Sequence, residues 1–121
     1  MIKAIKFVSL AVRNQDVSLE FFTQKLGFNV ATDQPFNEKQ RWIELKIPGA
    51  DTRLVLFTAE GHENRIGSFS GISFVSDDVV MTYKSLCKQG VQFQSEPKVA
   101  DWGTSVIMLD PDGNQFVISS K

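Results

Sequence analysis

Few side chains in this sequence are of the types that catalyse reactions or hold metals, and they are scattered along the chain. The single histidine, His62, lies in a stretch without periodicity, and Glu60 and Glu63 stand beside it at no recognisable ligand spacing. A solvated loop histidine is therefore the better interpretation. The single cysteine, Cys87, falls inside a predicted helix, where a buried small hydrophobe is favoured over a reactive nucleophile. The sequence contains no glycine-rich phosphate loop, Cys-His pair or Ser-His-Asp set.

Glu44 and Arg53 are the two residues that could act together in catalysis. Each lies in an alternating stretch, and alternation places both side chains on the same side of two successive strands. We expect an apolar setting to raise the pKa of Glu44 by desolvation, which would suit a general base. Arg53 would then polarise a carbonyl oxygen of the substrate. The alternative is a cross-strand ion pair without chemistry, so the sequence leaves enzymatic activity undecided.

Length and composition are those of an ordinary small globular protein. The 121 residues suit one domain, and 42% apolar with 22% charged residues are enough for a hydrophobic core. A net charge of −1 without a basic cluster argues against nucleic acid and anionic membranes as partners. A lone cysteine rules out an intrachain disulfide and suits a reducing compartment. No apolar run is long enough for a signal peptide or a membrane span, so we expect a cytoplasmic protein.

Hydrophobic periodicity predicts the elements that carry these side chains. In the first half we expect a helix over 17–25, capped by Asp16 or Ser18 and ended by Gly27. Strands are expected on either side of it, at 5–12, 28–32, 40–47 and 53–58.

The second half repeats this order of strands and helix. Asp77 and Asp78 cap a helix that reaches Cys87 and stops at Gly90, and a loop is expected over 96–101. Strands are expected at 71–75, 91–93, 104–109 and 114–119.

The segment Asp110-Pro111-Asp112-Gly113-Asn114 predicts the turn of the last hairpin. Pro111 presets φ, Asp112 can hydrogen-bond its own backbone, and Gly113 or Asn114 can supply a positive φ. A structural turn is the simplest interpretation, and it fixes which side chains of the following strand face inward.

The order β-α-β-β-β therefore occurs twice, which indicates an internal duplication. Phe7 corresponds to Gly71 at an offset of 64, and Gly27 to Gly90 at an offset of 63. We predict a single domain, 1–121, made of module one (1–60), a linker (61–69) and module two (70–121). The fold class is α+β, with two βαβββ modules that form a half-open mixed-sheet barrel, a cup with its helices outside.

Strand alternation divides the side chains into a set that faces the helices and a set that faces the cup. The helix-facing set consists of the bulkier, aliphatic side chains. The cup-facing set is where a small molecule would bind, with Trp42, Phe57 and Trp102 available for stacking. The alternative is that the tryptophans are rim or interface aromatics. The predicted ligand-binding residues are Phe7, Ser9, Trp42, Glu44, Arg53, Val55, Phe57, Gly71, Ser73, Trp102 and Val117.

The chain resembles the vicinal oxygen chelate superfamily, which includes glyoxalase I, extradiol dioxygenases and bleomycin-resistance proteins. The resemblance covers nearly the whole chain and is carried by FVSLAV at 7–12, SLEFF at 18–22, KLGF at 25–28, WG at 102–103 and DPDGN at 110–114. It is specific for the fold and says little about the reaction. It also implies a homodimer, in agreement with the open sheet edges that a single chain would leave.

Metal-dependent members of this superfamily place four ligands on the cup face, two from each half. By the register above, these positions fall on Phe7, Val55, Gly71 and Val117, and none of these side chains can coordinate a metal. The neighbouring residues, which a shift in register would bring in, form no better set. We therefore predict no metal and no other cofactor, which argues against glyoxalase I or dioxygenase activity.

The resemblance then favours a metal-free protein that binds a small hydrophobic or aromatic molecule in its cup, as resistance proteins that sequester a drug do. Two alternatives remain: a metal-independent enzyme based on Glu44 and Arg53, and a structural or regulatory domain. Metal-dependent chemistry would return if the register were wrong.

Overall fold

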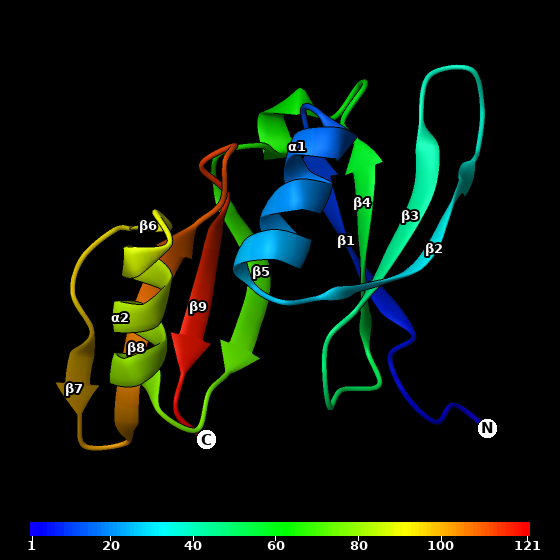
Figure 1. Cartoon of the computed structure of the whole chain (residues 1–121). Helices are drawn as coiled ribbons and strands as arrows, with labels where there is room; N and C mark the ends of the chain where they lie inside the picture. The colour runs from blue at the N-terminus through cyan, green and yellow to red at the C-terminus, as the bar shows by residue number, and fades with distance from the viewer. The chain divides into compact units, whose positions relative to one another are not determined.

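The computed structural model describes residues 1–121, which divide into two compact units, Met1–Ile66 and Gly67–Lys121 (Figure 1). Each unit has its own sheet and its own helix, and each is described by itself below.

The first unit contains a four-stranded mixed sheet. Its strands are β1 (Phe7–Val12), β2 (Asn29–Pro35), β3 (Arg41–Lys46) and β4 (Arg53–Thr58), in the spatial order β1-β4-β3-β2. The β1–β4 pair is parallel and the other two pairs are antiparallel. A parallel pair needs a long crossover, which here contains the helix and the β2–β3 hairpin.

The helix of the first unit lies across one face of this sheet (Figure 1). It consists of α1 (Gln15–Glu20) and a π-helical turn, η1 (Phe21–Lys25), and a short 3₁₀ turn, η2 (Glu63–Arg65), follows the last strand. The core contains one set of alternating strand residues together with the helical Phe22, all less than 4% exposed. Its largest members are Leu10, Phe22, Ile43, Leu45, Leu54 and Leu56.

The start of this helix differs from the prediction. Asn14 is the cap residue, because its side-chain oxygen accepts from the backbone N–H groups of Asp16 and Val17. The prediction of Asp16 or Ser18 was therefore wrong, since several neighbouring residues can cap and only the local geometry selects one. Gly27 follows the helix with φ of 76°, as expected for a C-terminal stop.

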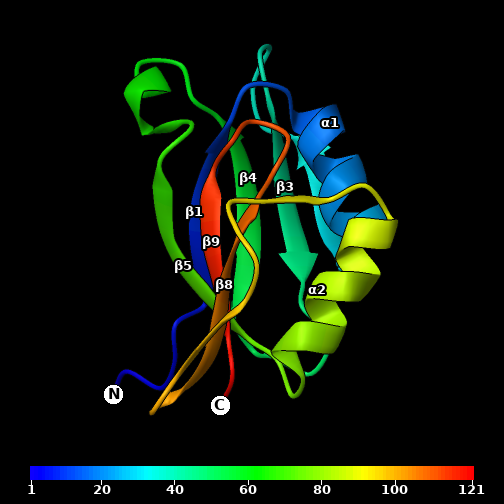
Figure 2. The ribbon, with the colours of Figure 1, turned by 90° about the vertical axis from the view of Figure 1, so that its left-hand side faces the viewer.

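The second unit contains β5 (Phe69–Val75), α2 (Val79–Lys88) and the four strands that follow. These are β6 (Gln92–Phe93), β7 (Lys98–Ala100), β8 (Gly103–Leu109) and β9 (Gln115–Ser119). The spatial order is β5-β9-β8-β6, with β7 also paired to β8, and β5 runs parallel to β9. Helix α2 contacts β8 and lies on one face of this sheet (Figure 2).

In the second unit the predicted helix cap is confirmed, whereas the predicted loop at 96–101 and the predicted burial of Cys87 were wrong. The helix cap is confirmed, since the Asp78 side chain accepts from the Met81 N–H. The loop expected at 96–101 contains β7, which is too short for a periodicity signal and forms by pairing with β8. Cys87 is exposed rather than buried, because it lies on the solvent side of α2.

The turn of the last hairpin is held by the side chain of Asp110. The Asp110 carboxylate accepts from the backbone N–H groups of Asp112 and Asn114, and its other oxygen accepts from the Asn114 amide. Asn114 in turn accepts from the Gly67 N–H at 2.8 Å, which ties the start of the unit to this turn. Asp110 and Asn114 are 6% and 1% exposed.

The observed elements confirm the α+β class and the repeated order of strand, helix and strands. The first unit is βαβββ, and the second has the same order with the short β7 as an additional strand. Neither helix is long and apolar enough to cross a membrane.

Candidate functional site

The register of the first sheet places seven of the predicted ligand-binding residues on one face. Val55 on β4 lies opposite Glu44 on β3 and opposite Ser9 on β1. Two residues earlier on β1 and β4, Phe7 and Arg53 are partners. Because side chains alternate, this face is the one opposite the buried Leu54 and Leu56. We call it the site face of the first sheet. It carries Phe7, Ser9, Trp42, Glu44, Arg53, Val55 and Phe57.

The polar centre of the site face is a hydrogen-bonded chain of three side chains. The indole N–H of Trp42 donates to Glu44 Oε2 at 2.7 Å, and Arg53 Nη1 donates to Glu44 Oε1 at 3.2 Å. Glu44 itself is only 8% exposed. Both oxygens of a nearly buried carboxylate are thus held by donors from the site face, and one of these donors is charged.

This arrangement corrects the expected acidity of Glu44. The hydrogen bond from Trp42 outweighs desolvation and, with the help of Arg53, lowers the pKa of Glu44 below its ordinary 4.5. The predicted rise in pKa was wrong, because the sequence indicated an apolar setting but not that the indole N–H of Trp42 points at the Glu44 carboxylate. An ionised carboxylate whose two oxygens are occupied is a weak general base. The alternative of a Glu44–Arg53 ion pair on adjacent strands is what the structure contains.

Aromatic rings surround this polar chain. The ring of Trp42 meets the ring of Phe7 edge-on at 5.7 Å between centroids, and the ring of Phe36 at 5.9 Å. On β4, the Phe57 ring lies under the guanidinium of Arg65 at 5.4 Å. Phe36 is 62% exposed and was not predicted as a site residue, since it lies in a polar loop. An aromatic residue within that loop was the signal that could have indicated it.

The predicted site residues of the second unit are less closely grouped. Ser73 and Val117 are direct partners in the β5–β9 pair and share a face of the second sheet. Gly71 lies where the β5–β9 register shifts and has φ of 79°, so simple alternation does not place it. Trp102 lies in the turn between β7 and β8 and is 65% exposed.

The side chains at the four positions where the superfamily resemblance predicts metal ligands do not fit a metal ion. Phe7 and Val55 are in the first unit and Gly71 and Val117 in the second, and none has a nitrogen, oxygen or sulfur donor in its side chain. Nowhere in the chain do three or more His, Cys, Asp or Glu side chains gather in a way that could hold a metal. His62 lies on the exposed approach to η2.

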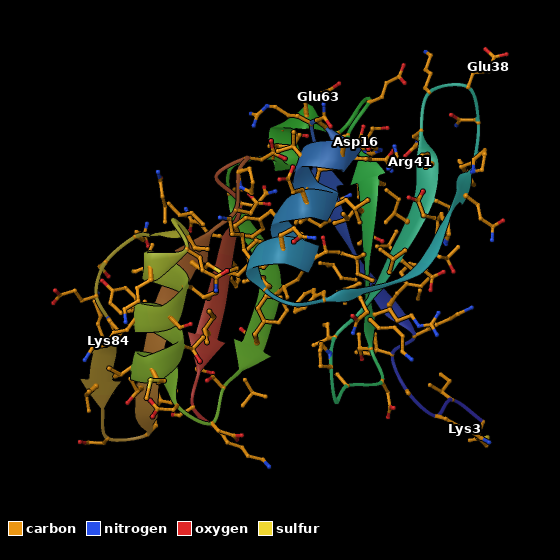
Figure 3. The ribbon with its side chains drawn as sticks, in the orientation of Figure 1. Lys3, Asp16, Glu38, Arg41, Glu63 and Lys84 are labelled. Carbon is orange, nitrogen blue, oxygen red and sulfur yellow. The ribbon has the colours of Figure 1, made fainter.

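A second polar network holds the β2–β3 hairpin to the helix beside the site face. Arg41 on β3 forms ion pairs with Asp16 of α1 at 2.9 Å and with Asp33 of β2 at 2.9 Å. Figure 3 shows the Asp16 and Arg41 side chains pointing toward each other. Gln15, buried at the start of α1, adds hydrogen bonds to the backbone of Arg41 and to the carbonyl of Leu56. The strand that carries Trp42 and Glu44 is thereby fixed to the helix.

The fold and these residues agree with one superfamily of proteins. The sequence profile described as Glyoxalase/Bleomycin resistance protein/Dioxygenase superfamily matches residues 4–118, and the chain belongs to this superfamily.

Individual relatives are similar over nearly their full length. The uncharacterized protein YetH of Bacillus subtilis (strain 168) is 36% identical over 118 residues, covering 98% of both chains. A solved structure of a superfamily member from Sphaerobacter thermophilus is 29% identical with a TM-score of 0.90, covering 99% of this chain and 98% of that one. TnmS3, an antibiotic binding protein from Streptomyces sp. CB03234, is 28% identical with a TM-score of 0.81, covering 98% and 96%.

Proposed function

We propose that this protein binds a small hydrophobic or aromatic molecule on the site face of the first sheet and acts by sequestering it. The observation that carries the proposal is the fixed position of Trp42. Its N–H is held by Glu44 at 2.7 Å and its ring is packed edge-on against Phe7. A ring that is already oriented loses little conformational entropy when a ligand stacks on it.

The electrostatics of the site face support binding over catalysis. A general base must take up a proton during the reaction, whereas the pKa of Glu44 is lowered and both its oxygens are engaged. Of the remaining site-face residues, Phe7 and Phe57 are partly exposed and offer aromatic surface rather than reactive groups, whereas Val55 is buried at 1% exposed. The antibiotic-binding activity in the name of TnmS3 is of the same kind, and we extend it to this chain as part of the proposal.

Fluorescence titration tests this proposal. The chain has two tryptophans, so a Trp102→Phe background leaves Trp42 as the only strong emitter. Addition of planar aromatic compounds should quench this emission with a saturable curve. Trp42→Ala should remove the binding when it is followed by equilibrium dialysis. Absence of saturable binding across a broad panel of hydrophobic and aromatic compounds, including antibiotics, would contradict the proposal.

A sequestering protein should protect cells from a toxic ligand. If a bound compound is an antibiotic, expression of the chain in a sensitive bacterium should raise the inhibitory concentration, and expression of Trp42→Ala should not. A protein that turned its ligand over would instead convert it during long incubation, and Glu44→Gln would stop that conversion while retaining affinity.

We further propose that the protein acts in the cytoplasm as a homodimer. The strand orders leave β1 and β2 at the edges of the first sheet and β5 at an edge of the second. Unpaired edges of this kind are commonly covered by a second copy. Light scattering coupled to size-exclusion chromatography should give twice the mass of one chain, and fractionation of the native host should place the protein with the cytoplasmic markers.

A further inference from the structure

Arg53 has hydrogen-bonding capacity that the protein does not use. A guanidinium carries five N–H donors, and in Arg53 one donor of Nη1 binds Glu44. Its Nε and second terminal nitrogen have no other protein partner, and the side chain is 38% exposed. Donors on a half-exposed guanidinium at the site face are therefore open to a ligand.

The position of this guanidinium is fixed relative to the ring of Trp42. One oxygen of the Glu44 carboxylate holds Trp42 and the other holds Arg53. Trp42 is also in contact with the rings of Phe7 and Phe36. The site face thus offers an aromatic surface with an oriented charged donor beside it, and such preorganised donors contribute to specificity.

The charges around the carboxylate make this end of the site face unfavourable for cations. The negative charge of Glu44 is already compensated by Arg53. Lys46 is the direct partner of Arg53 in the β3–β4 register and belongs to the same face. The positive charge of Lys6, which precedes β1, also helps to lower the pKa of Glu44. A ligand that carried a positive charge would meet this excess of positive charge, and the one carboxylate nearby is 8% exposed and already paired with Arg53.

We infer that the molecule bound on the site face is an aromatic compound with a hydrogen-bond acceptor oxygen at its edge, which Arg53 binds, and that aromatic cations are excluded. This inference rests on the proposed function and specifies its ligand class. Carbonyl, phenolate and carboxylate oxygens all share the required acceptor chemistry. Arg53 is then the residue that determines specificity, and Trp42 supplies the stacking surface.

A set of tricyclic probes of similar size tests the inference. 9-Fluorenone carries a neutral acceptor, fluorenone-2-carboxylate an anionic one, fluorene none, and proflavine a positive charge. We expect both fluorenones to bind about tenfold more tightly than fluorene, because a hydrogen bond from a charged donor changes the affinity by about this factor. Proflavine should bind at least about tenfold more weakly than fluorenone. Equilibrium dialysis measures all four without using protein fluorescence.

Variants assign the preference to Arg53. Arg53→Met should reduce fluorenone affinity to that of fluorene, leave fluorene affinity within about twofold, and improve proflavine binding, because Glu44 then lacks its partner. The double variant Arg53→Met with Glu44→Gln should lose both preferences without leaving an unpaired buried charge. Lys84→Met, on α2 of the second unit, removes one exposed positive charge and should leave all four affinities unchanged.

The outcomes separate this inference from the proposed function. Binding of fluorene as tight as that of fluorenone, or an unchanged preference in both Arg53 variants, would overturn the inference while the proposed function stands. Tight proflavine binding to the wild-type chain would do the same. Failure of all four probes and of the wider panel to bind would overturn both.

Discussion

The side-chain amide of Gln15 forms two hydrogen bonds with the backbone of Arg41, in the way that the backbone of a neighbouring strand would. The Gln15 amide accepts from the backbone N–H of Arg41 at 3.0 Å and donates to the carbonyl of the same residue at 2.7 Å. It also donates to the carbonyl of Leu56 at 2.9 Å. One buried side chain therefore connects the start of α1 to both β3 and β4.

Replacement of Gln15 by Leu should destabilise the protein by about 2–4 kcal/mol, because backbone groups of Arg41 and Leu56 lose their partner in a buried setting. The free energy of unfolding in urea measures this cost. Gln24→Leu, at an exposed position of η1, is the matched control and should change it by less than about 0.5 kcal/mol. Equal effects of the two substitutions would contradict the structural role of Gln15.

The Trp42 indole proton should report the ionisation of Glu44 directly. As the carboxylate is protonated, the hydrogen bond weakens and the indole N–H resonance moves. Because the pKa of Glu44 is lowered, the midpoint should lie below 4.5. Nitrogen–proton NMR spectra recorded during acidification give this midpoint, and Glu44→Gln should abolish the titration of this resonance. A midpoint at or above 4.5 would show that the donors do not hold the carboxylate.

Glu44 should also contribute to stability in a pH-dependent manner. A carboxyl group with a lowered folded pKa stabilises the fold above its unfolded pKa, and this contribution is lost as the pH falls through the folded value. Glu44→Gln should therefore cost about 1–2 kcal/mol near neutrality, with allowance for the half-exposed Arg53. The difference from wild type in urea unfolding should shrink below 4.5. A cost that did not vary with pH would indicate a packing effect only.

Asp110 should have the opposite pH dependence. Burial raises the pKa of Asp110 above its ordinary 3.8, against the lowering effect of its hydrogen bonds from Asn114 and Asp112. The folded state then binds more protons than the unfolded state, so stability falls as the pH rises through the raised pKa. Relative to Asp110→Asn, the wild-type free energy of unfolding should decrease from below 3.8 toward neutrality. A constant difference across this range would refute the assignment.

Gly103, where β8 begins, should not tolerate a side chain. It has φ of 148°, and an added Cβ would collide with Ser120 Oγ, which accepts from the Thr104 N–H at 2.9 Å. Gly103→Ala should therefore cost about 2–3 kcal/mol, from backbone strain and the loss of this bond. In a Ser120→Ala background the same change should cost only the strain, about 1–2 kcal/mol. Thermal unfolding of the four proteins separates the two terms.

Gly49→Ala serves as a control for the strain alone. Gly49 also has a positive φ, of 79°, but nothing lies within 4 Å of a Cβ at this position. Gly49→Ala should lower the free energy of unfolding by about as much as Gly103→Ala does in the Ser120→Ala background. If Gly103→Ala were no more costly than Gly49→Ala, the contact with Ser120 would have no energetic consequence.

Properties that depend on local spacing could be predicted from the sequence. The alternation of Phe116 and Ile118 with Gln115 and Val117 determined which residues of β9 are buried, and the repeat of strand, helix and glycine indicated the two βα repeats. Asp78, followed by a helical period, determined the second cap. These signals are local because each depends on the geometry of a single strand, helix end or turn.

Properties that depend on partners distant in sequence or on exact rotamers were decided only by the tertiary structure. Cys87 is at a helical position whose exposure depends on which face packs on the sheet. β7 exists because β8 is beside it. The acidity of Glu44 depends on an indole and a guanidinium, and the sequence showed both residues without the direction of their side chains. Alternation could place Trp42, Glu44 and Arg53 on one face, but hydrogen bonds act over about 3 Å, a scale that only packed coordinates define.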